Sequence, residues 1–290
     1  MTRKVVLILL ALVLALSVGL VACAPPAEEE EEEEEEHVGE QEEEEEEEAC
    51  DFADPNLEAA IREAIDKPAG PIYPSDLESL TSFYAEEKDI SNLTGLECAT
   101  RLAELGFCGN QISDISPLAN LTNLTYLDLC VNEIVNVSPL ANLTNLTVLN
   151  LEKNQISDIS PLANLTALTE LNLKVNQISD ISPLANLTSL TELFLGDNQI
   201  SNISALVNLS SLTAFCLHGN QISDISILAN LTNPEKLCLY DNQISDIEPL
   251  VNNPGLSAGD WVDLQYNPLS TTSINTYIPQ LEARGVDAEY

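Results

Sequence analysis

Positive charge is the scarcest property of this chain. It has 10 lysines and arginines among 290 residues, against 48 aspartates and glutamates, and its formal net charge at pH 7 is −38. A protein that binds nucleic acid neutralises phosphates with clustered cations. The same negative charge opposes close packing of the folded part against an anionic membrane surface. The composition therefore excludes nucleic acid as a direct ligand.

Groups that commonly carry catalysis are also few. The two histidines are His37 and His218, and neither a glycine-rich phosphate loop nor a metal-ligand motif occurs. Cys216 lies two residues before His218, but such side chains splay on a strand unless a third group orients them. A zinc site from Cys216, His218 and Cys238 would lack a fourth ligand. The sequence predicts a protein that is not an enzyme and has no cofactor or metal.

Residues 1–22 predict export. Met1 to Lys4 is basic, and residues 5–22 form an uncharged apolar run long enough to raise the question of a membrane-spanning helix. Small residues precede Cys23, where a signal peptide would be cut. The segment resembles a bacterial lipoprotein signal, which implies that Cys23 is the lipid-attachment site; an uncleaved signal anchor is the alternative. We expect an exported protein on the cell surface, held to the envelope membrane only through its lipid.

Residues 23–49 predict a disordered tether. Unbroken glutamate runs at 28–36 and 42–48 dominate this segment, and they offer no apolar surface whose burial would offset the entropy of ordering. Their like charges repel one another and extend the segment. Calcium binding is the alternative, although loose carboxylates lack the fixed geometry of a calcium site.

The charge beyond the tether is negative too. When the 17 tether glutamates and the two N-terminal cations are set aside, residues 50–290 keep 31 acidic and 8 basic residues, a net charge of −23. This field steers positively charged ligands toward the folded part. The expected partner is therefore a protein or a cell-surface polymer that is basic or bridged by cations.

Residues 80–255 repeat a unit of 22 residues with the pattern LxxLxLxxN. Apolar residues alternate around Leu105 and Leu127, as in a strand with one buried face. Strands this short gain hydrogen bonds and a continuous core only by stacking in register. The pattern predicts an α/β solenoid with a parallel sheet on one side and 3₁₀ or irregular structure on the other. Intact units begin at Leu102, Leu124, Leu146, Leu168, Leu190, Leu212 and Pro234.

Three polar positions recur in the unit. An asparagine column is expected to turn inward and satisfy the backbone groups that the bend leaves unpaired. The recurrent Ser-Pro-Leu, as in Ser116-Pro117-Leu118, predicts a serine N-cap followed by proline at the first position of a short helical turn. Aspartates in a turn column are expected to be structural or solubilising. The asparagines are Asn110, Asn132, Asn154, Asn176, Asn198, Asn220, Asn242 and Asn267. The aspartates are Asp114, Asp158, Asp180, Asp224 and Asp246.

Both ends of the solenoid need caps, because an open solenoid exposes its core there. Residues 50–79 are expected to form a helical N-terminal cap, whose first helix begins after Asp54. Residues 256–290 are expected to hold the last repeat and a C-terminal cap. Within them, residues 272–284 predict a helix that Pro279 kinks or begins, and the last five residues are candidates for an edge strand.

This pattern, with its signature Asn-Gln-Ile-Ser-Asp-Ile-Ser-Pro-Leu, resembles the internalin-type class of bacterial leucine-rich-repeat proteins over residues 80–270. The resemblance implies a curved right-handed coil whose sheet lines the concave face, and it implies that this face binds host or partner proteins. No immunoglobulin-like segment is recognisable, so the resemblance does not extend to a role in host invasion.

Side chains between the core leucines of each strand are expected to line the concave face. Function must be read from these positions because the repeat does not dictate them. Five of the 13 aromatic residues lie there, and exposed aromatics on a rigid sheet are typical binding anchors. Scattered surface aromatics are the alternative. Tyr240, Trp261 and Tyr266 are expected to form the densest aromatic cluster. The candidate ligand-binding residues are Tyr126, Asp128, Glu170, Glu192, Phe194, Tyr240, Trp261 and Tyr266.

Cysteines recur in the same columns. Cys108 and Cys130 occupy one column on neighbouring repeats, and so do Cys216 and Cys238. Adjacent strands lie about 4.8 Å apart, within the Cα range of a disulfide, and an exported protein meets oxidising conditions. Against pairing, side chains in parallel register do not point at one another. The sequence leaves both disulfides open. The cysteines outside these columns, with no assigned role, are Cys50 and Cys98.

Two functions of different kinds are compatible with these features. The leading one is a surface lipoprotein whose concave face binds a protein or polymer partner in adhesion or recognition. The alternative is a structural envelope component whose acidic stalk and face organise cations or wall polymer.

Overall fold

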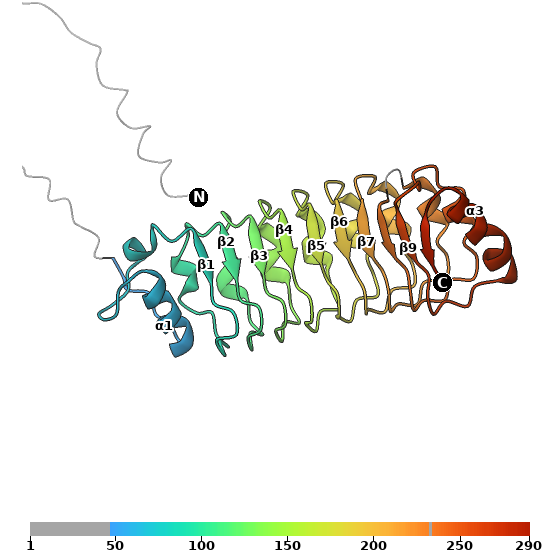
Figure 1. Ribbon diagram of the computed structural model, residues 1–290. Helices are drawn as coiled ribbons and strands as arrows, with labels where there is room; N and C mark the ends of the chain where they lie inside the picture. The colour runs from blue at the N-terminus through green and yellow to red at the C-terminus, as the bar shows by residue number, and fades with distance from the viewer. Residues whose placement is uncertain (1–46, 232–233) are drawn as a thin grey trace, which may run out of the picture. The chain divides into compact units, whose positions relative to one another are not determined.

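The computed structural model describes residues 47–231 and 234–290. The predicted signal peptide, the lipid-attachment site Cys23 and most of the predicted tether lie outside the described residues. Residues 46–290 form one compact unit, in which the strands form a single parallel sheet in the order of the sequence (Figure 1). None of the described helices is both long enough and apolar enough to cross a membrane.

The strands confirm the register predicted from the repeat. Each residue pairs with its equivalent in the next repeat, so Ser82 pairs with Glu104 and Glu104 with Tyr126. The described strands are β1 (Ser82–Tyr84), β2 (Glu104–Gly106), β3 (Tyr126–Asp128), β4 (Val148–Asn150), β5 (Glu170–Asn172), β6 (Glu192–Phe194), β7 (Ala214–Cys216), β8 (Lys236–Cys238), β9 (Trp261–Asp263) and β10 (Asp287–Glu289).

Short helical turns form the opposite, convex side, as predicted. The turns are three to five residues of 3₁₀ helix, except for one of four residues that is α-helical, because the convex segment of a repeat has no room for a longer helix. The turns are η2 (Leu96–Cys98), η3 (Ser116–Leu118), η4 (Ser138–Asn142), η5 (Ser160–Asn164), η6 (Ser182–Asn186), η7 (Ser204–Asn208), η8 (Ser226–Asn230) and the short α2 (Glu248–Val251). One continuous cluster of buried leucine, isoleucine and phenylalanine side chains lies between the two sides.

The asparagine column forms the predicted ladder inside the bend. Asn176 shows the pattern: its Nδ2 donates to the carbonyls of Leu151 (3.0 Å), Leu173 (3.1 Å) and Lys174 (3.2 Å). Its Oδ1 accepts the Ile156 N–H at 3.0 Å. Each asparagine therefore links its own turn to the preceding repeat, and it satisfies backbone groups that the chain reversal would otherwise leave unpaired.

The prediction that serine caps the convex turns is wrong. Ser116 is the first residue of η3, whose N-cap position is occupied by Ile115 without a side-chain cap. Asp114 does the capping instead: its Oδ1 accepts the Ser116 N–H at 2.9 Å. The side chain that precedes the serine by two residues reaches this N–H in an Asx turn. The bond to a serine N–H recurs at Asp158, Asp180 and Asp224, and Asp246 accepts the Glu248 N–H in the same way. The structural role predicted for this column is therefore confirmed.

Acid is expected to weaken these caps. The backbone N–H and hydroxyl of the following serine hold the pKa of Asp158, Asp180 and Asp224 below the usual 3.8. A carboxylate whose pKa is lower in the folded state stabilises the fold above pH 3.8 and loses that contribution as pH falls through the folded pKa. Replacing all three by asparagine should therefore reduce the fall in Tm between about pH 5 and pH 3, measured by circular dichroism.

The chain contains a precedent for this substitution. Asn136 and Asn202 occupy the aspartate column in their repeats. Each accepts the N–H of the serine two residues later at 2.9 Å, and neither side chain titrates. A charge-matched control replaces three exposed glutamates, Glu133, Glu235 and Glu282, by glutamine. If this control reduced the fall in Tm between about pH 5 and pH 3 by the same amount, net charge and not the aspartate caps would account for the acid sensitivity.

The N-terminal cap is a helix fastened to the first repeat. Helix α1 (Pro55–Ala64) begins after Asp54, as predicted, and buries Leu57 and Ile61; η1 (Pro74–Leu77) follows. Asp54 caps α1 through the Asn56 and Leu57 N–H groups, and its second oxygen accepts the N–H groups of Ser91 (2.8 Å) and Asn92 (3.2 Å). A Cys50–Cys98 disulfide closes the cap covalently, a pairing that the sequence did not indicate.

At the other end, η9 (Ser273–Tyr277), a π-helical turn, leads into α3 (Ile278–Ala283). Pro279 lies at the junction of the π-helical turn and α3, inside a continuous helical segment from residue 271 to residue 283, and it has no N–H to donate to the preceding turn. The predicted helix therefore continues through Pro279, and its hydrogen-bonding pattern changes from π to α there. The chain turns at Gly285 (φ 85°), and β10 pairs with β9 as the last strand of the sheet.

Candidate ligand-binding face

The concave face consists of the strand side chains that point away from the core. Two columns of such residues run along the sheet, one through the first residue of each strand and one through the third. A further column, which includes Gly196, His218 and Tyr240, lies two residues beyond the strand ends. The central residue of each strand from β1 to β9 is buried. The two halves of the face, β1–β5 and β6–β10, carry different chemistry.

Tyr84 and Tyr126 dominate the N-terminal half. The Tyr84 hydroxyl donates to Glu104 Oε2 at 2.8 Å, and this bond raises the Tyr84 pKa to about 12. The two tyrosine rings lie 6.3 Å apart with their planes tilted by 53°. Gly106 lies beside Tyr84 in the sheet, and a Cβ there would lie 2.5 Å from Tyr84 Cδ1. The ring therefore occupies the space that any other residue at this position would fill.

Carboxylates surround this pair. The Tyr126 pKa is raised by partial burial and by the charges of Asp128, Glu170, Glu86 and Glu104, in that order. Partial burial and then the charge of Glu192 also raise the Glu170 pKa. These shifts indicate negative potential over β2–β6, which a cationic ligand would relieve.

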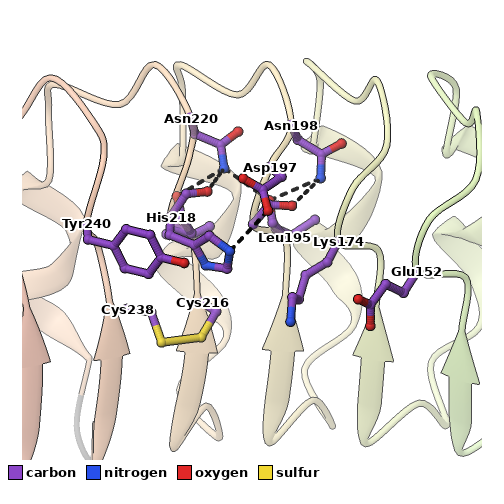
Figure 2. Close-up of polar contacts among 12 residues, drawn as sticks. Glu152, Lys174, Leu195, Asp197, Asn198, Cys216, His218, Asn220, Cys238 and Tyr240 are labelled. Atoms are coloured by element: carbon purple, nitrogen blue, oxygen red, sulfur yellow. Dashed lines mark hydrogen bonds and ion pairs between the residues drawn. A yellow bond between two sulfur atoms is a disulfide. The ribbon is translucent and has the colours of Figure 1, made fainter. Parts of the chain in front are cut away.

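His218 anchors the C-terminal half (Figure 2). Its ring stacks on Tyr240 at 4.5 Å with an interplanar angle of 11°, and its Nε2 lies 3.3 Å from Asp197 Oδ2. The ring lies over Gly196, where a Cβ would come within 2.2 Å of His218 Cε1. His218 is only 7% exposed, and its buried Nδ1 has no hydrogen-bond partner among the described residues.

The predicted cluster of Tyr240, Trp261 and Tyr266 does not form. Tyr240 stacks on His218, and the Trp261 indole N–H donates to Glu289 on β10 at 3.0 Å. Tyr266, 80% exposed, lies in the turn beyond β9 with φ 58°, so it is on the rim and not on the concave face. The repeat pattern could not anticipate this separation, because the last repeat is lengthened and β10 adds a partner for Trp261.

The other predicted residues occupy the face singly. Glu192 is exposed on β6, and Glu170 on β5 and Phe194 on β6 are half-buried. Asp128 Oδ1 accepts the Cys130 N–H at 2.9 Å. One oxygen of this carboxylate is therefore committed to the turn, which gives Asp128 a structural role beside its charge.

Both column pairs of cysteines are disulfides in the structure. Cys108 pairs with Cys130 and Cys216 with Cys238, with Cα–Cα distances of 4.5 Å and 4.4 Å. The zinc arrangement considered for Cys216, His218 and Cys238 has no free thiolate in this state. The cysteines of the first pair and Asp128 form the single group within the described residues that could hold a metal ion, and the disulfide occupies both of its sulfurs.

The sequence did not single out Tyr84, Gly106, Gly196 or His218 as parts of the site. A usable signal was present: a glycine at an outward position in a strand or just beyond one, with a tyrosine or histidine in a neighbouring repeat. Gly106 neighbours Tyr84 on β1, and Gly196 precedes His218 by one 22-residue step. An absent side chain on a sheet surface makes room for a ring from the adjacent strand.

Comparison with known proteins agrees with this architecture. The family model described as leucine-rich repeats (2 copies) matches residues 100–142, 122–164, 144–186, 166–208 and 210–252. The crystal structure of an internalin (inlF) from Listeria monocytogenes is 33% identical, covers 82% of this chain and 76% of its own, and has a TM-score of 0.67. The chain is an internalin-type leucine-rich-repeat protein.

Internalin C2 (inlC2) from the same bacterium is 38% identical and covers 76% of this internalin-type chain and 93% of its own, with a TM-score of 0.66. The plant peptide hormone receptor RGFR1, solved in complex with RGF2, is 26% identical with a TM-score of 0.56, and covers 68% of this chain and 34% of the receptor. No curated protein matches the sequence. Leucine-rich-repeat proteins of the internalin type commonly mediate protein binding, and their fold is typically a scaffold without catalytic activity.

Proposed function

We propose that this internalin-type chain is a lipid-anchored surface protein whose concave face binds a protein partner without catalysing a reaction. The observation that carries the proposal is the concave face itself. It presents aromatic rings, among them Tyr84 at 50% exposure, on a sheet held rigid by parallel pairing and the asparagine ladder. Rings presented on a rigid surface bind with little loss of conformational entropy.

Family membership and charge support the same proposal. Among similar structures, RGFR1 is solved in complex with RGF2. The net charge of −23 on residues 50–290 favours encounters with a basic partner. Cys23 would tie the chain to the membrane, and the glutamate-rich segment would hold the concave face away from it.

Capture experiments test the proposal. Residues 46–290, one compact unit, would be immobilised and exposed to secreted-protein and cell-wall fractions. Replacing Phe194, Tyr240 and Trp261 by alanine leaves the charge unchanged and is expected to reduce capture at least tenfold, since the loss of one buried anchor costs about 1 to 2 kcal/mol. If wall polymer were retained only in the presence of calcium, and equally well by the variant without these rings, the result would instead support the structural role in organising wall polymer.

A matched variant controls for general damage to the surface. Val135 is 55% exposed and lies in the segment between β3 and η4, away from the concave columns. Its replacement by alanine should leave capture unchanged. Equal loss from both variants would show that binding does not use the concave face. A separate experiment tests the lipid anchor. The full-length chain with Cys23→Ala is expected to be released into the medium, which membrane fractionation would show.

A further inference from the structure

Tyr84, Glu104, Gly106 and Tyr126 form a structured feature at the N-terminal end of the concave face, here called the tyrosine notch. Tyr84 belongs to β1, Glu104 and Gly106 to β2, and Tyr126 to β3; these strands are the first three of the sheet (Figure 1). The 53° tilt between the two rings excludes face-to-face stacking. Half of Tyr84 is exposed, so ring surface is available to a ligand.

The position of the Tyr84 ring, and not the backbone conformation, requires a glycine at residue 106. Gly106 does not have a left-handed φ, so its conformation is open to any residue. What excludes a side chain is Tyr84, whose Cδ1 would lie 2.5 Å from a Cβ at this position. Tyr84 is held at its other end by the 2.8 Å bond from its hydroxyl to Glu104 Oε2. The ring is therefore positioned before any ligand arrives.

Among the described residues, no lysine or arginine forms an ion pair with the carboxylates around the notch. Glu86, Glu104, Asp128 and Glu170 all act on Tyr126. Within the described residues, the ion pairs made by lysine and arginine lie in the N-terminal cap, at Glu58 and Asp76. The notch thus combines aromatic faces with unneutralised carboxylates, the two features that attract an organic cation.

We propose that the tyrosine notch binds an arginine or lysine side chain presented by an extended segment of a partner protein. The inference rests on the proposed function of the concave face and names the chemistry recognised at one end of it. A guanidinium or ammonium group stacks on the tyrosine faces, while a carboxylate accepts its N–H groups. A hard divalent cation requires a cage of oxygen ligands, and the aromatic walls of the notch do not provide one.

The probe is a fluorescein-labelled peptide of alternating glycine and arginine, with a twin in which citrulline replaces each arginine. Citrulline keeps the planar shape and removes the charge. Binding to residues 46–290 would be measured by fluorescence anisotropy at about 0.15 M ionic strength, where charges farther apart than about 8 Å are largely screened. The arginine peptide is expected to bind and the citrulline peptide to lose at least tenfold in affinity.

Two variants separate the notch from the general negative field. Tyr84→Ala removes one wall, and Gly106→Ala keeps both rings but displaces Tyr84 from its position. Both leave the net charge unchanged, and both are expected to weaken binding of the arginine peptide about tenfold. The matched control is Tyr290→Ala, because Tyr290 is 56% exposed and lies at the opposite end of the chain.

The proposal that the tyrosine notch binds a cationic side chain would be contradicted if the arginine peptide still bound both Tyr84→Ala and Gly106→Ala. Equal affinity of the unsubstituted protein for the arginine and citrulline peptides would contradict it as well. The same variants in the capture experiment distinguish the two proposals. Capture that depends on Phe194, Tyr240 and Trp261 but not on Tyr84 sustains the concave-face function and rejects the notch. If the arginine peptide binds in a way that depends on Tyr84 but no partner is captured, the notch proposal stands and the proposed partner-binding function of the concave face is rejected.

Discussion

Replacing Asn176 by alanine is expected to lower the free energy of unfolding by about 3 kcal/mol. The substitution removes three donor contacts to carbonyls and the acceptor for the Ile156 N–H. Ile156 is fully buried, so water cannot replace that acceptor without opening the turn. A buried donor left unpaired costs about 1 to 3 kcal/mol, and the carbonyls add to this. Equilibrium unfolding in urea, followed by circular dichroism, measures the change.

The control for this prediction is another asparagine of the repeat. Asn164 lies on the convex side at the end of η5 and is exposed, so alanine there should change stability by less than about 0.5 kcal/mol. Asn176→Asp should destabilise as strongly as Asn176→Ala, because a carboxylate would face three carbonyl oxygens. Similar stability for Asn176→Ala and Asn164→Ala would show that the ladder is dispensable in a single repeat.

Loss of the Cys50–Cys98 disulfide is expected to destabilise the N-terminal cap by about 4 kcal/mol. The two cysteines are separated by 48 residues, and a loop of that length removes substantial entropy from the unfolded chain. Without the bond, α1 stays attached by the packing of Leu57 and Ile61 and by the Asp54 cap. A cap whose opening is local should then exchange amide hydrogens far faster than the repeats do.

Hydrogen exchange on the double variant Cys50→Ser, Cys98→Ser tests this expectation. Protection of α1 should fall about a thousandfold, the equivalent of 4 kcal/mol, while protection of α3 in the same sample stays unchanged. Loss of protection throughout the solenoid would mean that the cap and the repeats unfold as one unit. Unchanged protection of α1 would mean that its noncovalent contacts suffice.

Periodicity in the sequence was enough to predict the fold. A step of 22 residues requires each strand to lie beside its copy, so the pairing of Ser82, Glu104 and Tyr126 could be written down in advance. The inward asparagines followed from the need to satisfy backbone groups in a turn that recurs identically. The error at Ser116 arose because serine and aspartate are both good capping residues, and only the path of the chain places the Asp114 oxygen at the serine N–H.

The candidate site was less predictable, because it lies where the repeat is broken. Column position identified Tyr126 and Phe194 as outward-facing, yet it did not show that Tyr84 would lean across to Gly106 or His218 to Gly196. Those contacts depend on side-chain rotamers between neighbouring strands, which a repeat pattern does not encode. Trp261 was assigned to an open cluster, whereas β10 supplies Glu289 as its partner.

Composition showed that positive charge is scarce, and spacing showed the length of the repeat and the column in which each residue lies. These are properties of the amino-acid sequence itself. They determine that the molecule is an acidic solenoid with a regular core and a row of variable outward positions. The pairing of Cys50 with Cys98, the seating of two rings over glycines and the rim position of Tyr266 required the folded chain. Each of these depends on distances between segments that sequence spacing does not define, and they decide which outward residues form a binding surface.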